Sequence, residues 1–144
     1  MDVQVLEVPA HTRGAITFVM DGHAFTGDTL FLMGCGRLFE GDPATMFSSL
    51  AKLKALPDTT KIWCGHEYTA SNGRFALTLE PGNAALQTRM KNLATPSVPA
   101  TMADEMATNP FLRTGSAEIR KALGMEQEDD VSVFAEIRRR KDVF

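Results

Sequence analysis

Residues 42–66, DPATMFSSLAKLKALPDTTKIWCGH, hold a helix signal followed directly by a strand signal. Asp42 and Pro43 form a typical helix start, because an acidic N-cap accepts free amide hydrogens and proline fits the first helical position. Apolar residues then recur at helical spacing until Pro57 ends the helix. Lys61–Cys64 reads as a short strand. This order of elements is typical of a domain built from layers of helix and sheet.

The residues before this stretch have the pattern of β-structure. Valines alternate with polar neighbours over residues 3–8, as expected of a half-buried strand. An apolar run over residues 15–20 stops at Asp21-Gly22, which is a strong signal for a two-residue hairpin. A third run covers residues 24–26, and the glycine-rich segment 33–37 is predicted to be a loop.

The pattern after about Glu67 is helical. Three apolar stripes follow helical spacing, and they consist of Leu86, Met90 and Leu93, of Ile119 and Leu123, and of Val133, Phe134 and Ile137. The change of character lies between residues 67 and 82. We therefore expect two domains, residues 1–70 with a sheet and residues 71–144 built of helices.

Composition describes an ordinary globular protein of 144 residues, with 44% hydrophobic and 23% charged residues. A net charge of −3 argues against nucleic acid as the main partner. No stretch approaches the roughly 18 apolar residues of a membrane span, and no secretory signal is expected at the N-terminus. Cys35 and Cys64 indicate no disulfide framework, so we expect a cytoplasmic protein.

Three potential metal ligands follow strand-like segments, where functional groups are commonly carried. They are His11, Asp28 and His66. Together they offer two imidazoles and one carboxylate, a mixed set suited to Zn²⁺, Fe²⁺ or Mn²⁺. Their spacing alone supports this weakly, because the three are far apart and no short metal-binding pattern is present.

Each of these residues also has a simpler reading. A single histidine beside a strand is commonly a surface or hydrogen-bonded residue, and an aspartate after glycine commonly forms a turn. Glu67 has the position of a helix-start acid, and His23 is read as no ligand at all. The two cysteines read as small buried thiols rather than nucleophiles.

Several motifs in order along the chain resemble one known family. They are the runs at residues 25–31 (FTGDTLF), 34–41 (GCGRLFEG), 64–69 (CGHEYT), 80–85 (EPGNAA), 109–113 (NPFLR) and 138–142 (RRRKD). The chain resembles the C-terminal portion of glyoxalase II, or hydroxyacylglutathione hydrolase, of the metallo-β-lactamase superfamily. The resemblance implies an α+β fold: the second half of an αββα sandwich, followed by an all-helical glutathione-binding domain.

The same resemblance implies a binuclear metal site. His11 matches a ligand of the first metal, Asp28 the carboxylate that bridges both, and His66 a ligand of the second. Two divalent cations are expected, zinc first, with iron or manganese as alternatives. Such cations lower the pKa of a shared water, and the resulting hydroxide hydrolyses the thioester of S-lactoylglutathione, a step in methylglyoxal detoxification.

Substrate contacts are also implied by the resemblance. Arg37, Tyr68, Arg138 and Lys141 match positions that contact glutathione, with Asn72 a weaker candidate. Cationic donors suit the carboxylates of glutathione. The basic run at residues 138–141, which otherwise reads as a solvated helix end, therefore gains a role for two of its four members.

Some departures from the family affect what this chain can do. Phe39 stands where some members have tyrosine, and Ala15 where many have histidine. The family's H-x-H-x-D-H run, which supplies four further ligands, does not occur in the sequence. We therefore expect a fragment with one open sheet face, at most a poor metal site of its own, and little or no activity alone. Its missing N-terminal half is an expected partner.

Two other functions remain open from the sequence. One is an iron-dependent persulfide dioxygenase of the same superfamily, which the basic tail makes less favoured. The other is a non-catalytic remnant that serves as an interaction module. Metal analysis with an oxygen-uptake assay separates the first from a hydrolase, and a folded, metal-free chain indifferent to glutathione would indicate the second.

Overall fold

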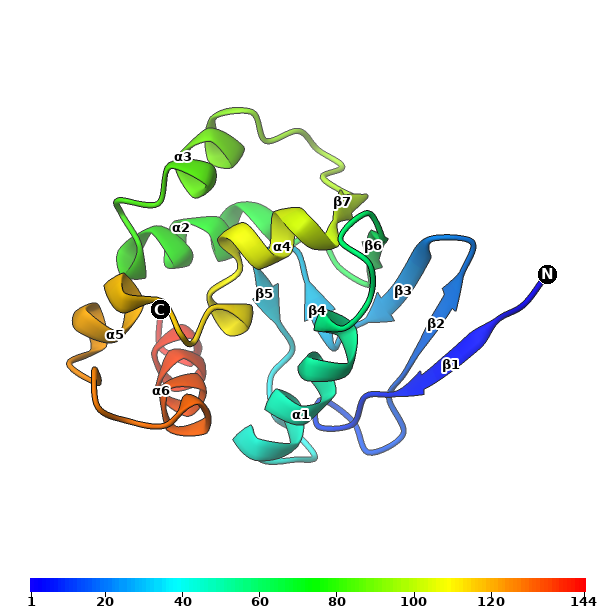
Figure 1. Cartoon of the computed structure of the whole chain (residues 1–144), viewed down its shortest axis with the longest axis horizontal. Coiled ribbons are helices and arrows are strands. Elements are labelled where there is room, and N and C mark those ends of the chain that lie inside the picture. Colours follow the sequence, from blue (N-terminus) through cyan, green and yellow to red (C-terminus); the bar gives the residue numbers. More distant parts are fainter.

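The computed structural model describes every residue from Met1 to Phe144. Strands occupy the first part of the chain and helices most of the rest (Figure 1). The strands are β1 (Gln4–Glu7), β2 (Ile16–Met20), β3 (His23–Gly27), β4 (Leu30–Phe31), β5 (Gly34–Cys35), β6 (Lys61–Cys64) and β7 (Ala100–Thr101). The helices are α1 (Pro43–Lys54), α2 (Thr69–Leu79), α3 (Ala84–Lys91), α4 (Met102–Thr108), the 3-10 helix η1 (Pro110–Leu112), α5 (Ala117–Leu123) and α6 (Asp130–Asp142).

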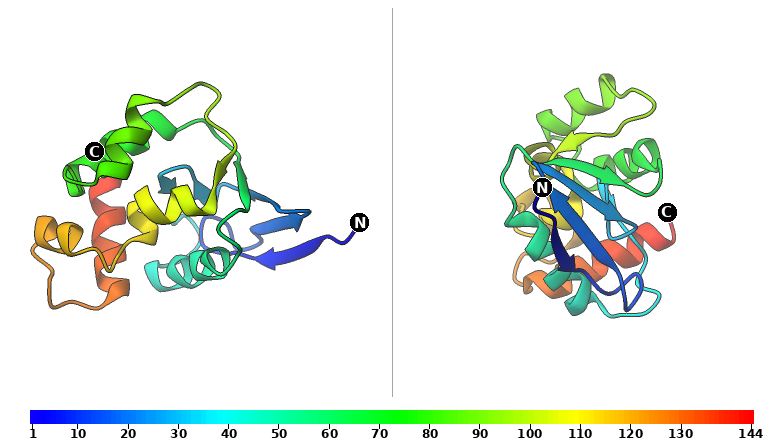
Figure 2. Two further views of the ribbon diagram at one scale, coloured as in Figure 1. Left: turned by 45° about the horizontal axis from the view of Figure 1, so that its top comes forward. Right: turned by 90° about the vertical axis from the view of Figure 1, so that its right-hand side faces the viewer.

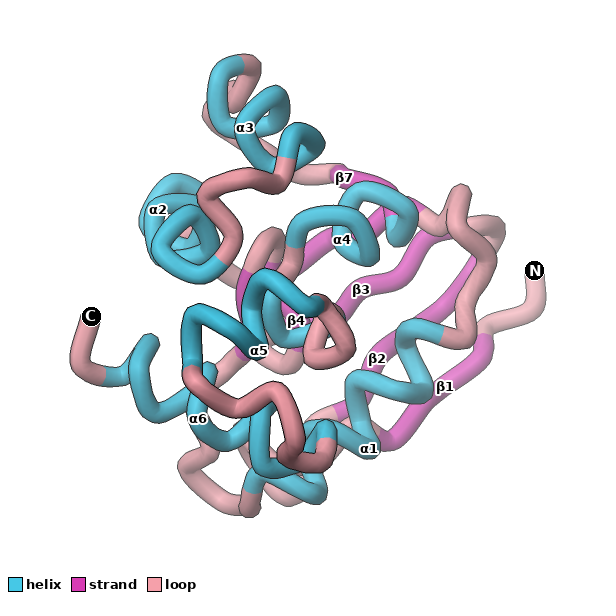
Figure 3. Tube along the Cα trace, turned by 60° about the vertical axis from the view of Figure 1, so that its left-hand side comes forward, coloured by secondary structure: helices cyan, strands magenta, loops and turns pink.

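Five strands form one mixed sheet in the order β1-β2-β3-β6-β7. Neighbours are antiparallel except for β3 and β6, which run parallel. β4 and β5 form a separate two-stranded ribbon. The helices gather on one side of the sheet (Figure 3), and the strands β1 to β3 extend beyond most of the helices (Figure 2). The α+β architecture expected from the sequence is confirmed.

The hairpin between β2 and β3 is the predicted one. Asp21 and Gly22 have positive φ angles of 47° and 78°. A two-residue type I′ turn requires positive φ at both positions, which glycine adopts freely and aspartate tolerates. The turn pairs Met20 with His23 and sets the register of the antiparallel pair.

Helix α1 begins as predicted. The Asp42 carboxylate accepts the amide hydrogen of Thr45 at 2.8 Å, and Pro43 is the first helical residue. Leu50 and Leu53 are among the residues that bury its inner face. The helix ends three residues before Pro57, because proline disfavours helical backbone in the residue before it.

Two expectations need correction. Residues 33–37 are not all loop, because Gly34–Cys35 is the strand β5 and pairs with β4 around a turn at Met33. The C-terminal region also contributes one strand, since Ala100 pairs with Ile62 and extends the sheet through β7. Runs of two residues carry no periodic signal, so neither strand was visible in the sequence.

A hydrophobic core of 20 buried residues lies between the sheet and the helices. It joins Ala24 and Ile62 of the sheet to Phe111, Phe134 and Ile137 of the C-terminal region. One core therefore spans both parts of the sequence, and a division of the chain at residue 70 stays a prediction.

The other face of the sheet is uncovered. Val5, Phe18, Phe25 and Trp63 are partners in register across four strands. The first three are 52%, 42% and 41% exposed. The alternating valines Val3 and Val5 therefore lie on the solvent-exposed face of the sheet in this chain. Val8 lies on the other face and is fully buried.

Membrane insertion through a helix is not a feature of this fold. No helix combines the length and the apolar character needed to span a bilayer.

Candidate metal and substrate site

The proposed metal ligands meet at one edge of the sheet because of strand direction. β3 and β6 are parallel neighbours, so Asp28 and His66, which follow them, emerge at the same edge. The amide of Gly65 donates to the carbonyl of Gly27 at 2.8 Å and closes the gap between the two strand ends. His11 lies in the β1–β2 loop, which reaches this edge because β2 is antiparallel to β3.

Asp28 lies between the two histidines. Its Oδ1 is 2.7 Å from Nδ1 of His66, and its Oδ2 is 3.6 Å from Nε2 of His11. Nδ1 of His11 is 2.9 Å from the carbonyl oxygen of Arg37. Carbonyl and carboxylate oxygens only accept hydrogen bonds, so each Nδ1 carries the hydrogen. The lone pair of each neutral ring is then on Nε2, the atom available to a metal.

Two glycines make this close approach possible. A Cβ on Gly36 would overlap the carbonyl oxygen of Asp28 and press on Nδ1 of His11. A Cβ on Gly65 would lie 2.5 Å from Oδ1 of Asp28. Gly36 lies in the motif GCG and Gly65 directly precedes His66 in CGH, and the lack of a side chain at both leaves room for the Asp28 carboxylate and the His11 imidazole.

The three side chains fit a metal in kind but not in number. Imidazole nitrogen and carboxylate oxygen are ordinary donors to Zn²⁺, Fe²⁺ and Mn²⁺. No group of three or more His, Cys, Asp or Glu side chains in this structure has the arrangement needed to hold an ion. His66 bonds Asp28 directly in this structure. The chain thus offers part of a coordination shell.

One cavity of about 440 Å³ contains this cluster. All three proposed metal ligands and all five proposed substrate contacts line it. The remaining lining residues, which the sequence did not single out as contacts, are Phe31, Cys35, Phe39 and Ser71. The structure therefore brings together residues that lie up to 130 positions apart, from His11 to Lys141.

Aromatic rings build the wall beside His66. The rings of His66 and Tyr68 are parallel within 2°, with centroids 5.0 Å apart. Phe31 meets Tyr68 edge-on at 5.1 Å and His66 at 6.1 Å. Such contacts restrict the ring of His66, which is otherwise half-exposed. Phe31 ends the motif FTGDTLF, but nothing in the sequence indicates that its ring contacts His66 and Tyr68.

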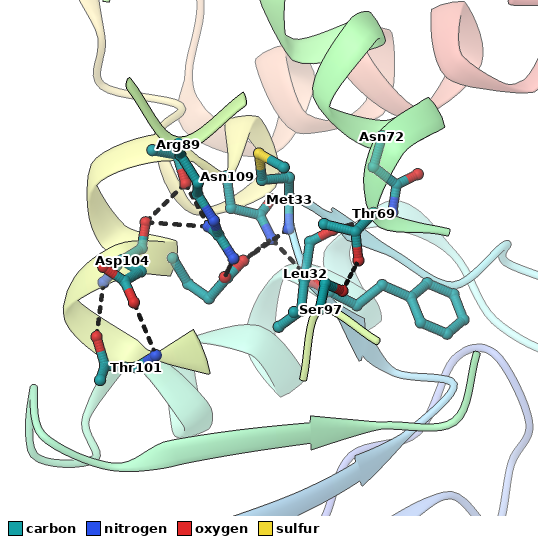
Figure 4. A network of polar contacts seen from close by, with 12 residues as sticks. Leu32, Met33, Thr69, Asn72, Arg89, Ser97, Thr101, Asp104 and Asn109 are labelled. Carbon is teal, nitrogen blue, oxygen red and sulfur yellow. Dashed lines mark hydrogen bonds and ion pairs between the residues drawn. The ribbon is translucent and has the colours of Figure 1, made fainter. Parts of the chain in front are cut away.

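The β4–β5 ribbon, which separates Asp28 from Arg37, is held by side chains from the helical region. Asn72 donates to the carbonyl of Leu32, and Asn109 donates to the carbonyls of Phe31 and Gly34 (Figure 4). Asn72 is 5% exposed and lies against Gly34. Its amide nitrogen therefore supports the pocket wall, which limits what it can offer to a ligand.

A buried carboxylate completes this support. Oε1 of Glu105 accepts the amide hydrogen of Met33 at 2.7 Å, and its Oε2 pairs with Arg89 at 2.6 Å. Glu105 is fully buried, and this desolvation raises its pKa despite the neighbouring Arg89 charge. The turn at Met33, which has a φ of 57°, is thereby fixed from the helical side.

The thiols behave as the sequence predicts. Cys35 is buried, and burial raises the pKa of its thiol to about 11. Cys64 is partly buried, and burial also raises its pKa. Both cysteines are free. Neither has the depressed pKa of a nucleophilic cysteine.

The cationic residues of the cavity differ in how firmly they are held. Arg138 is 5% exposed and donates to the carbonyl of Cys35 at 2.7 Å. Arg37 is 63% exposed at its side chain, and its closest anionic partner is Asp142 at 3.9 Å. Asp142 is a residue that the sequence reading did not select, although its spacing of four from Arg138 on one helix is a recognised pairing distance.

The arrangement of layers and site defines the class of protein. The fold is that of the metallo-β-lactamase superfamily. Solved structures similar to it include ETHE1 from Myxococcus xanthus (TM-score 0.61, 24% identity, 95% of this chain and 44% of that one). Others are TTHA1623 in a di-iron-bound form (TM-score 0.52, 28% identity, 76% and 42%) and a metallo-β-lactamase from Staphylococcus aureus (TM-score 0.55, 25% identity, 95% and 38%).

Sequence comparison gives the family. The family described as "Hydroxyacylglutathione hydrolase C-terminus" matches residues 67–144. Curated relatives called hydroxyacylglutathione hydrolase, from Brucella ovis and Brucella abortus, are 54% identical over 99% of this chain. The chain belongs to the hydroxyacylglutathione hydrolase family. It spans 58% of the length of these relatives.

Proposed function

We propose that this chain is the C-terminal part of an enzyme that hydrolyses S-(2-hydroxyacyl)glutathione, with S-lactoylglutathione as its substrate. The observation that carries the proposal is the single cavity lined by both the imidazole–carboxylate cluster and the cationic residues. A thioester of glutathione needs both features, because its reacting carbonyl and its carboxylates are parts of one molecule. The names of the relatives support the same reaction.

His11, Asp28 and His66 are the residues that would hold the metal ions. Two bound divalent cations, zinc first, would supply Lewis acidity and a water of lowered pKa. The carbonyl of Arg37 holds the His11 ring in the tautomer that exposes Nε2. The Asp28 carboxylate has one oxygen toward each imidazole, which suits a bridging role. Further ligands would come from the rest of the longer protein.

The cationic side of the cavity binds the glutathione moiety. Arg37 and Lys141 are the charged groups with room to meet its carboxylates, and the half-exposed Tyr68 offers a hydroxyl. Asn72 and Arg138 border the same space from more buried positions. Phe31 and Phe39 supply apolar wall that shields the reacting carbonyl from bulk water.

The uncovered sheet face is the proposed contact for the remainder of the protein. Its in-register row of Val5, Phe18, Phe25 and Trp63 is apolar and partly exposed. A sheet of this kind is stabilised when its open face packs against a second layer. We propose that the portion of the relatives beyond this chain forms that layer and brings the missing ligands.

A chimera tests the proposal. The N-terminal portion of the Brucella ovis relative, which this chain does not cover, is joined to this sequence, and turnover of S-lactoylglutathione and metal content are measured beside the chain alone. We expect hydrolysis by the chimera, little or none by the chain alone, and loss of activity in the chimera carrying Asp28→Ala. A folded, metal-loaded chimera without hydrolysis would refute the proposed reaction.

The same samples separate the alternatives. Oxygen uptake with glutathione persulfide and a content of one iron would indicate a persulfide dioxygenase instead. A chimera that folds, binds no metal and ignores glutathione would indicate a non-catalytic module. Substantial metal loading and turnover by the 144-residue chain alone would contradict the expectation that its site is incomplete.

A further inference from the structure

The last turn of α6 forms a charged cluster with the loop after β5. Oδ1 of Asp142 accepts from Nε of Arg138 at 3.0 Å and forms an ion pair with its Nη2 at 2.8 Å, and it lies 3.9 Å from Nε of Arg37. Lys141 lines the same cavity as both arginines. Three cations therefore surround one carboxylate, which itself is partly exposed.

Arg138 is held within the chain by its Nε and Nη1 groups. Its Nη1 donates to the carbonyls of Cys35 and Gly36, and its Nε donates to Asp142, which also forms an ion pair with Nη2. The face of its guanidinium lies over the ring of Phe111, at 5.1 Å. A guanidinium has five N–H groups, and the two on Nη2 donate no hydrogen bond within the chain, although the Asp142 carboxylate lies beside them. Arg138 ties α6 to the β5 loop, and Asp142 fixes its orientation.

Arg37 and Lys141 are held more loosely. The ion pair of Arg37 with Asp142 is long and exposed, and such pairs contribute little stability. The Lys141 ammonium makes no hydrogen bond or ion pair and lies 5.9 Å from the centre of the Phe144 ring. Burial lowers the pKa of its ammonium, as do the positive charges of Arg138 and Arg37, while Asp142 acts in the opposite direction. These two cations have fewer polar contacts within the chain than Arg138.

We propose that Asp142 is a positioning residue that acts as the internal counter-ion of the glutathione site. Its oxygen orients Arg138, and its negative charge weakens the attraction of Arg37 and Lys141 for an incoming carboxylate. This inference rests on the proposed function, because it assigns glutathione to this end of the cavity. In this role Asp142 keeps the affinity of the cavity for an anionic ligand below the affinity that the three cations alone would give.

Two substitutions separate orientation from charge. Asp142→Asn keeps an oxygen that can accept from Arg138 but removes the negative charge. We expect it to bind reduced glutathione about threefold more tightly at low salt, because one like charge near the ligand carboxylate is removed. Asp142→Ala removes the acceptor as well, so Arg138 loses its orientation and this gain is lost. Isothermal titration calorimetry of the whole chain measures both.

Glu136→Gln is the matched control. Glu136 lies on the same helix, pairs with Arg139 and Arg140, and does not line the cavity. Its substitution changes the net charge of the chain by the same amount. We expect glutathione affinity within experimental error of the parent chain.

The cluster can also be tested without a ligand. In Asp142→Asn, the pKa of Lys141 measured by NMR titration should fall relative to the parent chain, because a carboxylate that raises it is gone. If no variant binds glutathione, the substrate assignment fails, and this titration alone decides the role of Asp142. An unchanged Lys141 pKa, or equal glutathione affinity in Asp142→Asn and the parent chain, would overturn the inference.

Discussion

The ring of Tyr68 lies parallel to the ring of His66, with 5.0 Å between centroids and 2° between planes. Only Glu67 separates the two residues along the chain, and it points elsewhere: its carboxylate accepts from the amide and the hydroxyl of Ser97. This relationship gives Tyr68 a structural effect on the proposed ligand beside any contact with substrate.

Tyr68→Leu should loosen His66. A ring pair of this kind contributes about 1 kcal/mol, so we expect Zn²⁺ binding to the chain to weaken roughly fivefold. Tyr68→Phe keeps the ring and removes only the hydroxyl, and it should bind Zn²⁺ as the parent chain does. Competition with a chromophoric chelator measures both affinities. Equal weakening in the two variants would show that the hydroxyl, rather than stacking, matters.

Gly36→Ala should disrupt the cluster directly. The added Cβ overlaps the Asp28 carbonyl oxygen and crowds His11, so the backbone must shift. We expect a loss of stability of about 1–3 kcal/mol, as for other overpacked positions, together with weaker Zn²⁺ binding. Gly115→Ala is the control, because no atom lies within 4 Å of a Cβ at that position. Urea unfolding gives the free energies, and similar losses in both variants would contradict the steric argument.

Glu105→Ala should be far more costly than Glu136→Ala. The first leaves Arg89 and the Met33 amide without their buried partner, and breaking such a pair costs about 3–5 kcal/mol. The second breaks exposed pairs with Arg139 and Arg140, for which about 0–1 kcal/mol is expected. Denaturant unfolding of the two variants under one condition compares them. A difference below about 1 kcal/mol between the two losses would contradict the role of Glu105 as the buried partner of Arg89 and the Met33 amide.

Glu80 should make stability depend on pH. Burial alone would raise its pKa, but hydrogen bonds from Arg113 and Ser116 outweigh burial and lower it below 4.5. A carboxyl with a depressed folded pKa stabilises the protein above its unfolded pKa, and this contribution disappears as the pH falls through the folded value. The difference in free energy of unfolding between the parent chain and Glu80→Gln should therefore be greatest at pH 7 and shrink below pH 4.5. A constant gap in urea unfolding from pH 7 to pH 3 would contradict it.

Cys35 should resist alkylation in the native chain. Its thiol is buried, with a pKa of about 11, so little thiolate exists at pH 8 and reagents lack access. We expect iodoacetamide to label it only after unfolding in denaturant, as mass spectrometry of peptides would show. The cysteines labelled in denatured protein provide the control, and rapid native labelling of Cys35 would contradict its assignment as an inert thiol.

Sequence reasoning recovered the elements that carry strong local signals. Asp42-Pro43 and Asp21-Gly22 have turn and cap chemistry that acts within a few residues, so the start of α1 and the β2–β3 hairpin could be predicted. The strands β5 and β7 could not, because pairs of residues have no period and depend on distant partners. The three proposed metal ligands could be grouped only through the family resemblance, because Asp28 and His66 are brought together by the parallel pairing of β3 with β6.

The roles of side chains were harder to predict from the sequence than the positions of helices and strands. Arg138 matches a family contact position, but no sequence pattern shows that its Nε and Nη1 donate within the chain. Asp142 was overlooked for the same reason, because an acidic residue at a helix end usually reads as solvated surface. Burial and hydrogen-bond saturation are properties of the assembled fold, and they decide which of the cations can respond to a ligand.

The pairing of β7 with β6 has a consequence for protein engineering. Ala100 and Thr101 form the outer strand beside Ile62 and Lys61, the strand that leads to His66. A domain swap made at residue 70 would exchange the edge of the sheet together with the helices, and the recipient would have to accept a foreign strand next to its ligand-bearing one. Transplanting the helical half between relatives should therefore succeed where residues 61–64 are transferred together with residues 100–101.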